Sequence, residues 1–207
     1  MVVKFWKIKE NLFPQNFFYR HSKLVAPDLI GCYLIKENDN KNDQLKGLIV
    51  ETEAYSQEEE ACHGYRKITK SNQSLFGKPG TFYIYKSYGI HHCLNIVTDK
   101  ENFASGVLIR SVFISKMNER LASGPGLVTR TFSVDISFNS LEVLNNKSLW
   151  ISPRESIIEE KDLIQTTRIG ISKAKNIKWR WYLKNSRSIS KRLKGDRTPK
   201  FNNHLSF

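Results

Sequence analysis

Long apolar runs are missing from this chain of 207 residues. No stretch approaches the roughly 18 apolar residues of a membrane-spanning helix, and Lys4, Lys7 and Lys9 interrupt the amino-terminal segment. The sequence therefore predicts neither a membrane partner nor export. We expect a cytoplasmic, nucleoid-associated protein in a bacterium, or a nuclear one in a eukaryote. Because 40% of the residues are hydrophobic, the chain can bury a core of its own.

Cysteine is also scarce. Cys32, Cys62 and Cys93 are odd in number and widely spaced, which argues against a disulfide framework and favours reduced thiols. The glycine-rich phosphate loop of nucleotide enzymes is absent as well, because the turn at 77–80 is too short to form one.

Metal-ligand spacing is not present either. His63, His91, His92 and Cys93 are possible ligands, but adjacent His91 and His92 on a strand point to opposite faces and cannot readily share an ion. We therefore expect no metal and no cofactor.

Acidic residues are few compared with basic ones. There are 20 Asp and Glu against 33 Lys and Arg, a net charge of +13, and the segment 161–207 alone holds 13 basic and two acidic residues. Within it, 177–183 interleaves cations with aromatics and is expected to be a strand suited to a phosphate backbone. Nucleic acid is therefore the first candidate partner. Residues 191–207 are expected to form a basic tail after a single domain spanning 1–190.

Hydrophobic patterning predicts a mixed α/β (α+β) fold with a mainly antiparallel β core, because strands and helices do not alternate regularly. Helices are expected at 22–30, 113–122 and 126–134, with Ser22 as the first N-cap and Pro125 opening the last. Strands are expected at 32–36, 45–53, 81–85, 90–97, 106–112, 149–151, 168–172 and 178–183. Residues 56–80 are expected to be an irregular loop in which three consecutive glutamates, 58–60, are solvated.

Two stretches carry the candidate chemistry. In the first, apolar β-formers lead into Glu51 and Glu53, whose spacing places both carboxylates on one face of a strand. In the second, Tyr83 and Tyr85 share a face and Tyr88 follows at the tip of a hairpin. The carboxylates are either two exposed strand charges or the acid and base of a hydrolase. The tyrosines are either core aromatics or rings that bind something planar.

Several short blocks occur in order along the chain. They are Val50–Tyr55, Ala61–His63, Lys78–Thr81, Tyr83–Gly89, Cys93–Ile96, Val107–Arg110, Ser123–Gly126, Arg168–Ile171 and Trp179–Tyr182. Together they resemble the alkyladenine (3-methyladenine) DNA glycosylase family. The resemblance implies a single-domain mixed α/β fold that inserts a β-hairpin into the DNA minor groove and excises a flipped, damaged purine.

The resemblance implies that Glu53 is the general base that activates water and that Arg110 helps to hold this water. Glu51 is expected to support Glu53. The implied enzyme is a monofunctional glycosylase of base-excision repair, which hydrolyses the N-glycosidic bond and leaves an abasic site. The implied lesions are 3-methyladenine, 7-methylguanine, hypoxanthine and ethenoadenine.

The same resemblance implies how double-stranded DNA with damaged purines is bound by a monomer. Tyr55, His63 and Tyr85 would sandwich the extruded base. Asn95 would lie against the purine edge and disfavour guanine, and Tyr88 would wedge into the gap in the duplex.

Two other classes of function are alternatives. A metal-dependent nuclease would use the histidines, and a non-catalytic nucleic-acid-binding module would keep the basic surface and the hairpin. The intact Glu53 favours an enzyme over the module. After Gly124–Gly126 the family usually carries a lysine where this chain has Leu127, so one DNA contact of the family is not expected here.

Overall fold

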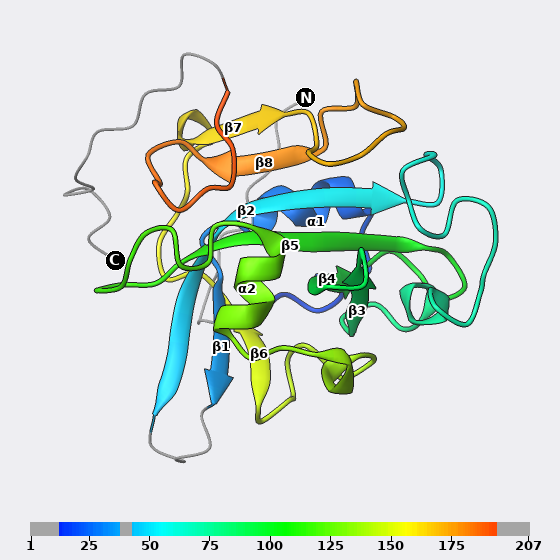
Figure 1. Ribbon diagram of the computed structural model, residues 1–207, viewed down its shortest axis with the longest axis horizontal. Coiled ribbons are helices and arrows are strands. Elements are labelled where there is room, and N and C mark those ends of the chain that lie inside the picture. The colour runs from blue at the N-terminus through cyan, green and yellow to red at the C-terminus, as the bar shows by residue number, and fades with distance from the viewer. Residues whose placement is uncertain (1–12, 38–42, 194–207) are drawn as a thin grey trace.

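The computed structural model describes residues 13–37 and 43–193 (Figure 1). The strands are β1 (Tyr33–Glu37), β2 (Gln44–Ser56), β3 (Phe82–Ser87), β4 (His91–Val97), β5 (Ser105–Phe113), β6 (Leu149–Ser152), β7 (Leu163–Thr166) and β8 (Arg180–Leu183). The helices are α1 (Ser22–Asp28) and α2 (Pro125–Thr131), with short 3₁₀ turns at Gln73–Phe76, Ile136–Phe138 and Glu160–Asp162. The strands form one curled antiparallel sheet in the order β3-β4-β5-β2-β1-β6, with β8 against β2 and β7 against β8. This single domain fits the expected α+β class.

β2 is the spine of the sheet. β5 pairs along one of its edges, whereas β1 and then β8 pair along the other. All residues from Gly47 to Ala54 are buried, because β2 has neighbours on both edges and α1 packs against it, with Thr52 Oγ1 donating to the backbone oxygen of Ala26 at 2.8 Å. The strand therefore carries Glu51 and Glu53 into the interior.

The two helices lie on opposite sides of the long strands, α1 behind β2 and α2 in front of β5 (Figure 1). The predicted first helix is confirmed, but its N-cap is His21, whose Nδ1 accepts a hydrogen bond from the Lys23 N–H at 3.0 Å. The Ser22 hydroxyl donates instead to the backbone oxygen of Tyr55 at 2.9 Å. This contact ties the start of α1 to the end of β2.

Two predicted elements are wrong. Residues 113–122 do not form a helix, because β5 runs through Phe113 and the chain then turns back, so that Val112 N–H donates to the Ala122 oxygen. Pairing with β5 satisfies backbone groups that a helix would satisfy internally. Residues 168–172 do not form a strand, because the backbone turns at Gly170 (φ +75°). The other predicted strands and α2 are confirmed with shifts at their ends, and β7 was not predicted.

β8 does not present its one cation, Arg180, to solvent. Arg180 is 3% exposed and donates to Glu51, while Trp181 and Tyr182 are buried. The expectation that 177–183 binds a phosphate backbone is therefore wrong for its central residues, which belong to the core. Most of the expected basic tail lies outside the described residues.

β3 and β4 form the expected tight hairpin. Ile90 N–H donates to the Ser87 oxygen at 3.1 Å and closes a turn whose central residues, Tyr88 and Gly89, have φ of 49° and 68°. Positive φ at both positions is the pattern of a type I′ turn, which suits the twist of paired strands. The turn holds the Tyr88 side chain 90% exposed at the tip.

Two clusters of buried side chains support the sheet. The larger one joins α1 and α2 to strands β1 to β6 and to β8. The smaller one packs beneath Tyr55 and Tyr85 and consists of Cys62, Leu75, Phe76, Tyr83, Val97 and Ala104. All three cysteines are free and buried, as expected. Across the described ranges, no helix is long and apolar enough to cross a membrane.

Candidate active site

A cavity of about 490 Å³ lies where β2, β5 and the β3–β4 hairpin meet, within the roughly 300–1,000 Å³ of small-ligand sites. Six of the seven predicted site residues line it: Tyr55, His63, Tyr85, Tyr88, Asn95 and Arg110. The seventh, Glu53, lies behind the wall. The cavity thus brings together residues that are far apart in the sequence.

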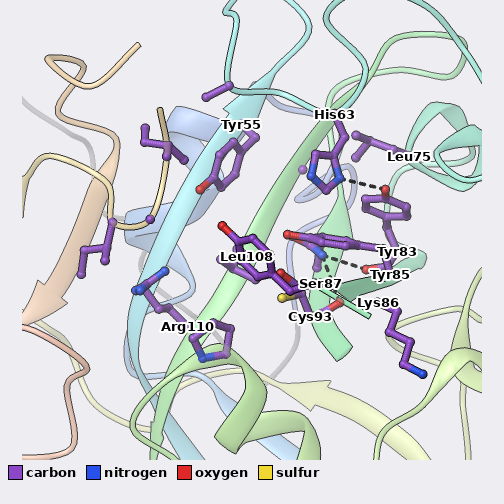
Figure 2. A pocket seen from close by; sticks show the side chains of 18 residues that line it. Tyr55, His63, Leu75, Tyr83, Tyr85, Lys86, Ser87, Cys93, Leu108 and Arg110 are labelled. Carbon is purple, nitrogen blue, oxygen red and sulfur yellow. Dashed lines mark hydrogen bonds between the residues drawn. The ribbon is translucent and has the colours of Figure 1, made fainter. Parts of the chain in front are cut away.

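Aromatic rings form two walls of the cavity (Figure 2). Tyr55 stands on one side, and His63 and Tyr85 stand on the other, with ring centroids 4.3 Å apart and planes at 70°. Tyr83 stacks on Tyr85 with centroids 5.5 Å apart, and its hydroxyl lies 3.2 Å from His63 Nδ1. Burial lowers the pKa of His63 from its ordinary 6.5, so the imidazole is neutral at neutral pH. A flat ring could stack between the two walls.

Glu53 exposes no surface, and its carboxylate accepts three hydrogen bonds. Oε2 accepts from the Tyr55 hydroxyl at 2.8 Å and from Arg110 Nη1 at 3.3 Å, and Oε1 accepts from the Ile169 N–H at 2.8 Å. All three donors belong to residues that line the cavity. Burial raises the pKa of Glu53 above its ordinary value, and the three donors offset only part of this shift. Such a carboxylate holds a proton more readily than a solvated one, which suits a general base.

A second buried carboxylate lies beside the first. Arg110 Nη1 is 3.3 Å from Glu53 and its Nε is 3.5 Å from Glu51, so both carboxylates occupy one face of β2, as their spacing predicts. Glu51 also accepts from Arg180 Nη1 and from the Ser111 hydroxyl, both at 2.7 Å. Glu51 exposes no surface, and its donors Arg180 and Ser111 do not line the cavity, whereas all three donors to Glu53 do.

Arg168 and Glu59 form a buried ion pair that the sequence did not reveal. Arg168 donates to both carboxylate oxygens of Glu59, at 2.6 and 2.8 Å, and its guanidinium lies 4.7 Å from the centre of the Tyr55 ring. The expectation that 58–60 is solvated is therefore wrong for Glu59, although its two neighbours are exposed. The pair holds one face of Tyr55 and fixes the chain next to Ile169. The only sequence signal was the Arg168–Ile171 block, which does not name a partner.

Asn95 is buried at the cavity with its amide fixed in place. Its Nδ2 donates to the backbone oxygens of Tyr83 at 3.0 Å and Cys93 at 3.2 Å, which uses both amide hydrogens. The side chain therefore cannot rotate without losing two hydrogen bonds, and it presents a rigid edge to a ligand.

Comparison with known proteins agrees with this geometry. A family model described as methylpurine-DNA glycosylase matches residues 16–187. The chain belongs to the methylpurine-DNA glycosylase family. As a member, it is a DNA glycosylase of base-excision repair, a hydrolase that acts on N-glycosyl bonds.

Relatives of this glycosylase match along most of their length. The chain is 40% identical over 193 residues to a protein of Carboxydothermus hydrogenoformans, which covers 87% of this chain and 100% of the relative. It is 39% identical over 189 residues to one of Trichodesmium erythraeum, covering 83% and 94% of the two chains. It is 36% identical over 181 residues to one of Francisella tularensis, covering 81% and 93%. All three relatives carry the name "Putative 3-methyladenine DNA glycosylase".

Proposed function

We propose that this glycosylase removes alkylated or deaminated purines that have been flipped out of duplex DNA, with Glu53 as the general base. The observation that carries the proposal is the buried carboxylate of Glu53 directly behind a cavity with aromatic walls. A base inside the helical stack cannot be attacked at its sugar, so it must be extruded at a cost of about a few kcal/mol. The cavity is the place that receives it.

Glu53 and Arg110 supply the hydrolytic chemistry. As the bond between the base and C1′ breaks, the sugar becomes oxocarbenium-like, and the water that adds to C1′ must lose a proton. Glu53 takes this proton, and Arg110, which contacts Glu53 and lines the cavity, holds the water. Because Glu53 exposes no surface, water reaches it only when nucleotide binding opens the wall of the cavity in front of it. The products are the free base and an abasic site.

The aromatic walls hold the flipped base. Tyr55 stacks on one face and Tyr85 with His63 on the other, each stacked base contributing roughly 1–3 kcal/mol. Purines such as 3-methyladenine and 7-methylguanine are positively charged, which favours contact with electron-rich ring faces and makes them good leaving groups. The neutral imidazole of His63 does not repel them. Hypoxanthine and ethenoadenine are the neutral lesions we propose.

The hairpin and a basic groove beside it contact the duplex. Tyr88, 90% exposed at the tip, fills the gap that the extruded base leaves. A second cavity of about 920 Å³ beside the hairpin is lined by Arg66, Lys67, Lys70 and Lys86. Over residues 13–37 and 43–193, none of these four cations has an acidic partner, so each can meet a phosphate.

The test is a cleavage assay on duplexes that each contain one of the four lesions. We expect strand breaks only after alkali treatment and equal activity in EDTA, because the mechanism uses no metal and no lysine nucleophile. Breaks without alkali, or activity lost in EDTA and restored by a divalent ion, would favour a metal-dependent nuclease. Binding without excision of any lesion would favour a non-catalytic binding module.

A further inference from the structure

Ser190 lies at the junction of the two buried carboxylates. Its hydroxyl accepts a hydrogen bond from Arg110 Nε at 2.9 Å and donates one to Glu51 Oε1 at 2.9 Å. Its backbone N–H donates to the other oxygen of Glu51 at 2.7 Å. Ser190 therefore connects Arg110 to Glu51 by direct contacts, although it does not line the cavity.

Arg110 contacts Glu53 and Ser190 through two different nitrogens. Nη1 is 3.3 Å from Glu53, while Nε points to Ser190. Because a guanidinium is planar and rigid, fixing Nε also fixes the direction of Nη1. Without the Ser190 hydroxyl, the nearest acceptor for Nε is Glu51 at 3.5 Å, too long for a good hydrogen bond. The guanidinium would then shift toward Glu51 and away from Glu53.

Arg180 balances the charge of Glu51, the residue that anchors Ser190. Arg180 Nη1 lies 2.7 Å from Glu51 Oε1, and its positive charge balances the negative charge of Glu51. The attraction of Glu51 for Arg110 is therefore weaker, and Arg110 can remain at Glu53. The same nitrogen donates to the backbone oxygen of Lys191 at 2.8 Å, which fixes the residue that follows Ser190.

The segment before Ser190 is buried and offers a matched control. Ile189 is buried, and its backbone oxygen accepts from Arg120 Nη1 at 2.8 Å. The hydroxyl of Ser188 is also buried, but it has no hydrogen-bond partner in the part of the chain that the structure describes. The hydroxyl of Ser190 therefore belongs to the hydrogen-bond network around Arg110, whereas the hydroxyl of Ser188 does not.

We propose that Ser190 is a positioning residue for base excision: anchored on Glu51, its hydroxyl holds Arg110 in the orientation in which Nη1 faces Glu53. Ser190 acts through Arg110 and does not touch the flipped base. This inference rests on the proposed role of Glu53 as the general base.

The test compares Ser190→Ala, Ser190→Thr and Ser188→Ala in single-turnover excision of the lesion that the wild-type protein removes fastest. Ser190→Ala should lower the rate about 10-fold, the scale of one lost hydrogen bond to a charged group, without lowering DNA affinity. Because a loosened Arg110 stabilises ionised Glu53 less, the acidic limb of the pH–rate profile should move to higher pH. Ser190→Thr, which keeps the hydroxyl, should restore both, and Ser188→Ala should match the wild type.

A wild-type rate and pH profile for Ser190→Ala would overturn the inference and leave the proposed function intact. So would equal rate losses in Ser190→Ala and Ser188→Ala that follow a lower Tm, because they would reflect folding and not the orientation of Arg110. A wild-type protein that excises none of the four lesions would overturn both.

Discussion

The hydroxyl of Tyr55 donates a 2.8 Å hydrogen bond to the carboxylate of Glu53, two residues earlier on β2. The ring of the same tyrosine forms a wall of the cavity, opposite His63 and Tyr85. Burial, together with the charge of Glu53, raises the pKa of Tyr55 well above its ordinary 10.0, so the hydroxyl remains a donor throughout the neutral range. One side chain thus contacts both the space proposed for the base and the group proposed to activate water.

Tyr55→Phe should separate these two contacts. The ring remains, so DNA affinity should not change, but Glu53 loses a donor that stabilises its charged form, and its pKa rises further. Since the base must be ionised, the rate falls as pH drops through this pKa, and the acidic limb of the pH–rate profile should move to higher pH. At neutral pH the expected loss is about two- to tenfold. Tyr55→Ala should in addition weaken lesion binding. An unmoved acidic limb in Tyr55→Phe would contradict the proposed link to Glu53.

Glu53→Gln should lower single-turnover excision by about 100-fold or more, because the amide cannot take a proton from water. DNA affinity should be retained or improved, since the variant removes a negative charge from the binding side of a basic protein. Glu160→Gln is the matched control, because Glu160 is exposed and lines neither cavity. Near-normal turnover in Glu53→Gln would rule out the carboxylate mechanism.

Glu51→Gln should act mainly on stability. The substitution leaves the buried guanidinium of Arg180 without its counter-charge, and breaking a buried pair in this way typically costs about 3–5 kcal/mol. Urea unfolding should therefore shift to a lower midpoint, whereas Glu160→Gln should leave the midpoint unchanged. Equal midpoints for the two variants would mean that the ion pair contributes nothing to stability.

Tyr88→Ala should slow excision while leaving the salt dependence of DNA binding unchanged, because the ring acts on unstacking and carries no charge. Tyr88→Phe keeps the ring and should excise at close to the wild-type rate. The measurements are single-turnover rates and the slope of log affinity against log salt concentration. An unaltered rate in Tyr88→Ala would exclude the wedge role.

Lys70→Ala should reduce the slope of log affinity against log salt by about 0.9, the value for one phosphate contact. Lys46→Ala is the control, because Lys46 is paired with Glu155 at 2.7 Å and lies over the Tyr33 ring, on a part of β2 that does not line either cavity. Equal slopes for the two variants would place the DNA outside the basic groove.

Asn95→Ser should relax discrimination against guanine. In the proposed binding mode the fixed amide of Asn95 meets the exocyclic amine of guanine, and the shorter serine side chain would leave room for that amine. The measurement is the ratio of excision rates for a guanine duplex and a hypoxanthine duplex, with Tm measured to check the fold. If the ratio does not rise, Asn95 is structural.

Sequence alone could predict what depends on neighbouring residues. Runs of apolar β-formers indicate β2 to β5, and the spacing of Glu51 and Glu53 puts them on one face. The sequence could not show which cations point into the core. Arg180 adds the same positive charge to the composition whether it pairs with Glu51 or binds a phosphate. Ion pairs such as that of Arg168 join segments 109 residues apart and depend on the complete sheet. Residues 113–122 have helical character, but pairing with β5 outweighs a weak local preference.

The buried charges near Glu51 also affect how the chain can fold while it is being synthesised. β2 emerges from the ribosome early, yet the partners of Glu51 on β8 and at Ser190 emerge last among the described residues. Until then, closing the sheet would bury Glu51 without the counter-charge of Arg180, at a cost of several kcal/mol. A nascent chain therefore cannot complete this centre before β8 and Ser190 have emerged, and a chain truncated before β8 lacks the Arg180 and Ser190 contacts of Glu51.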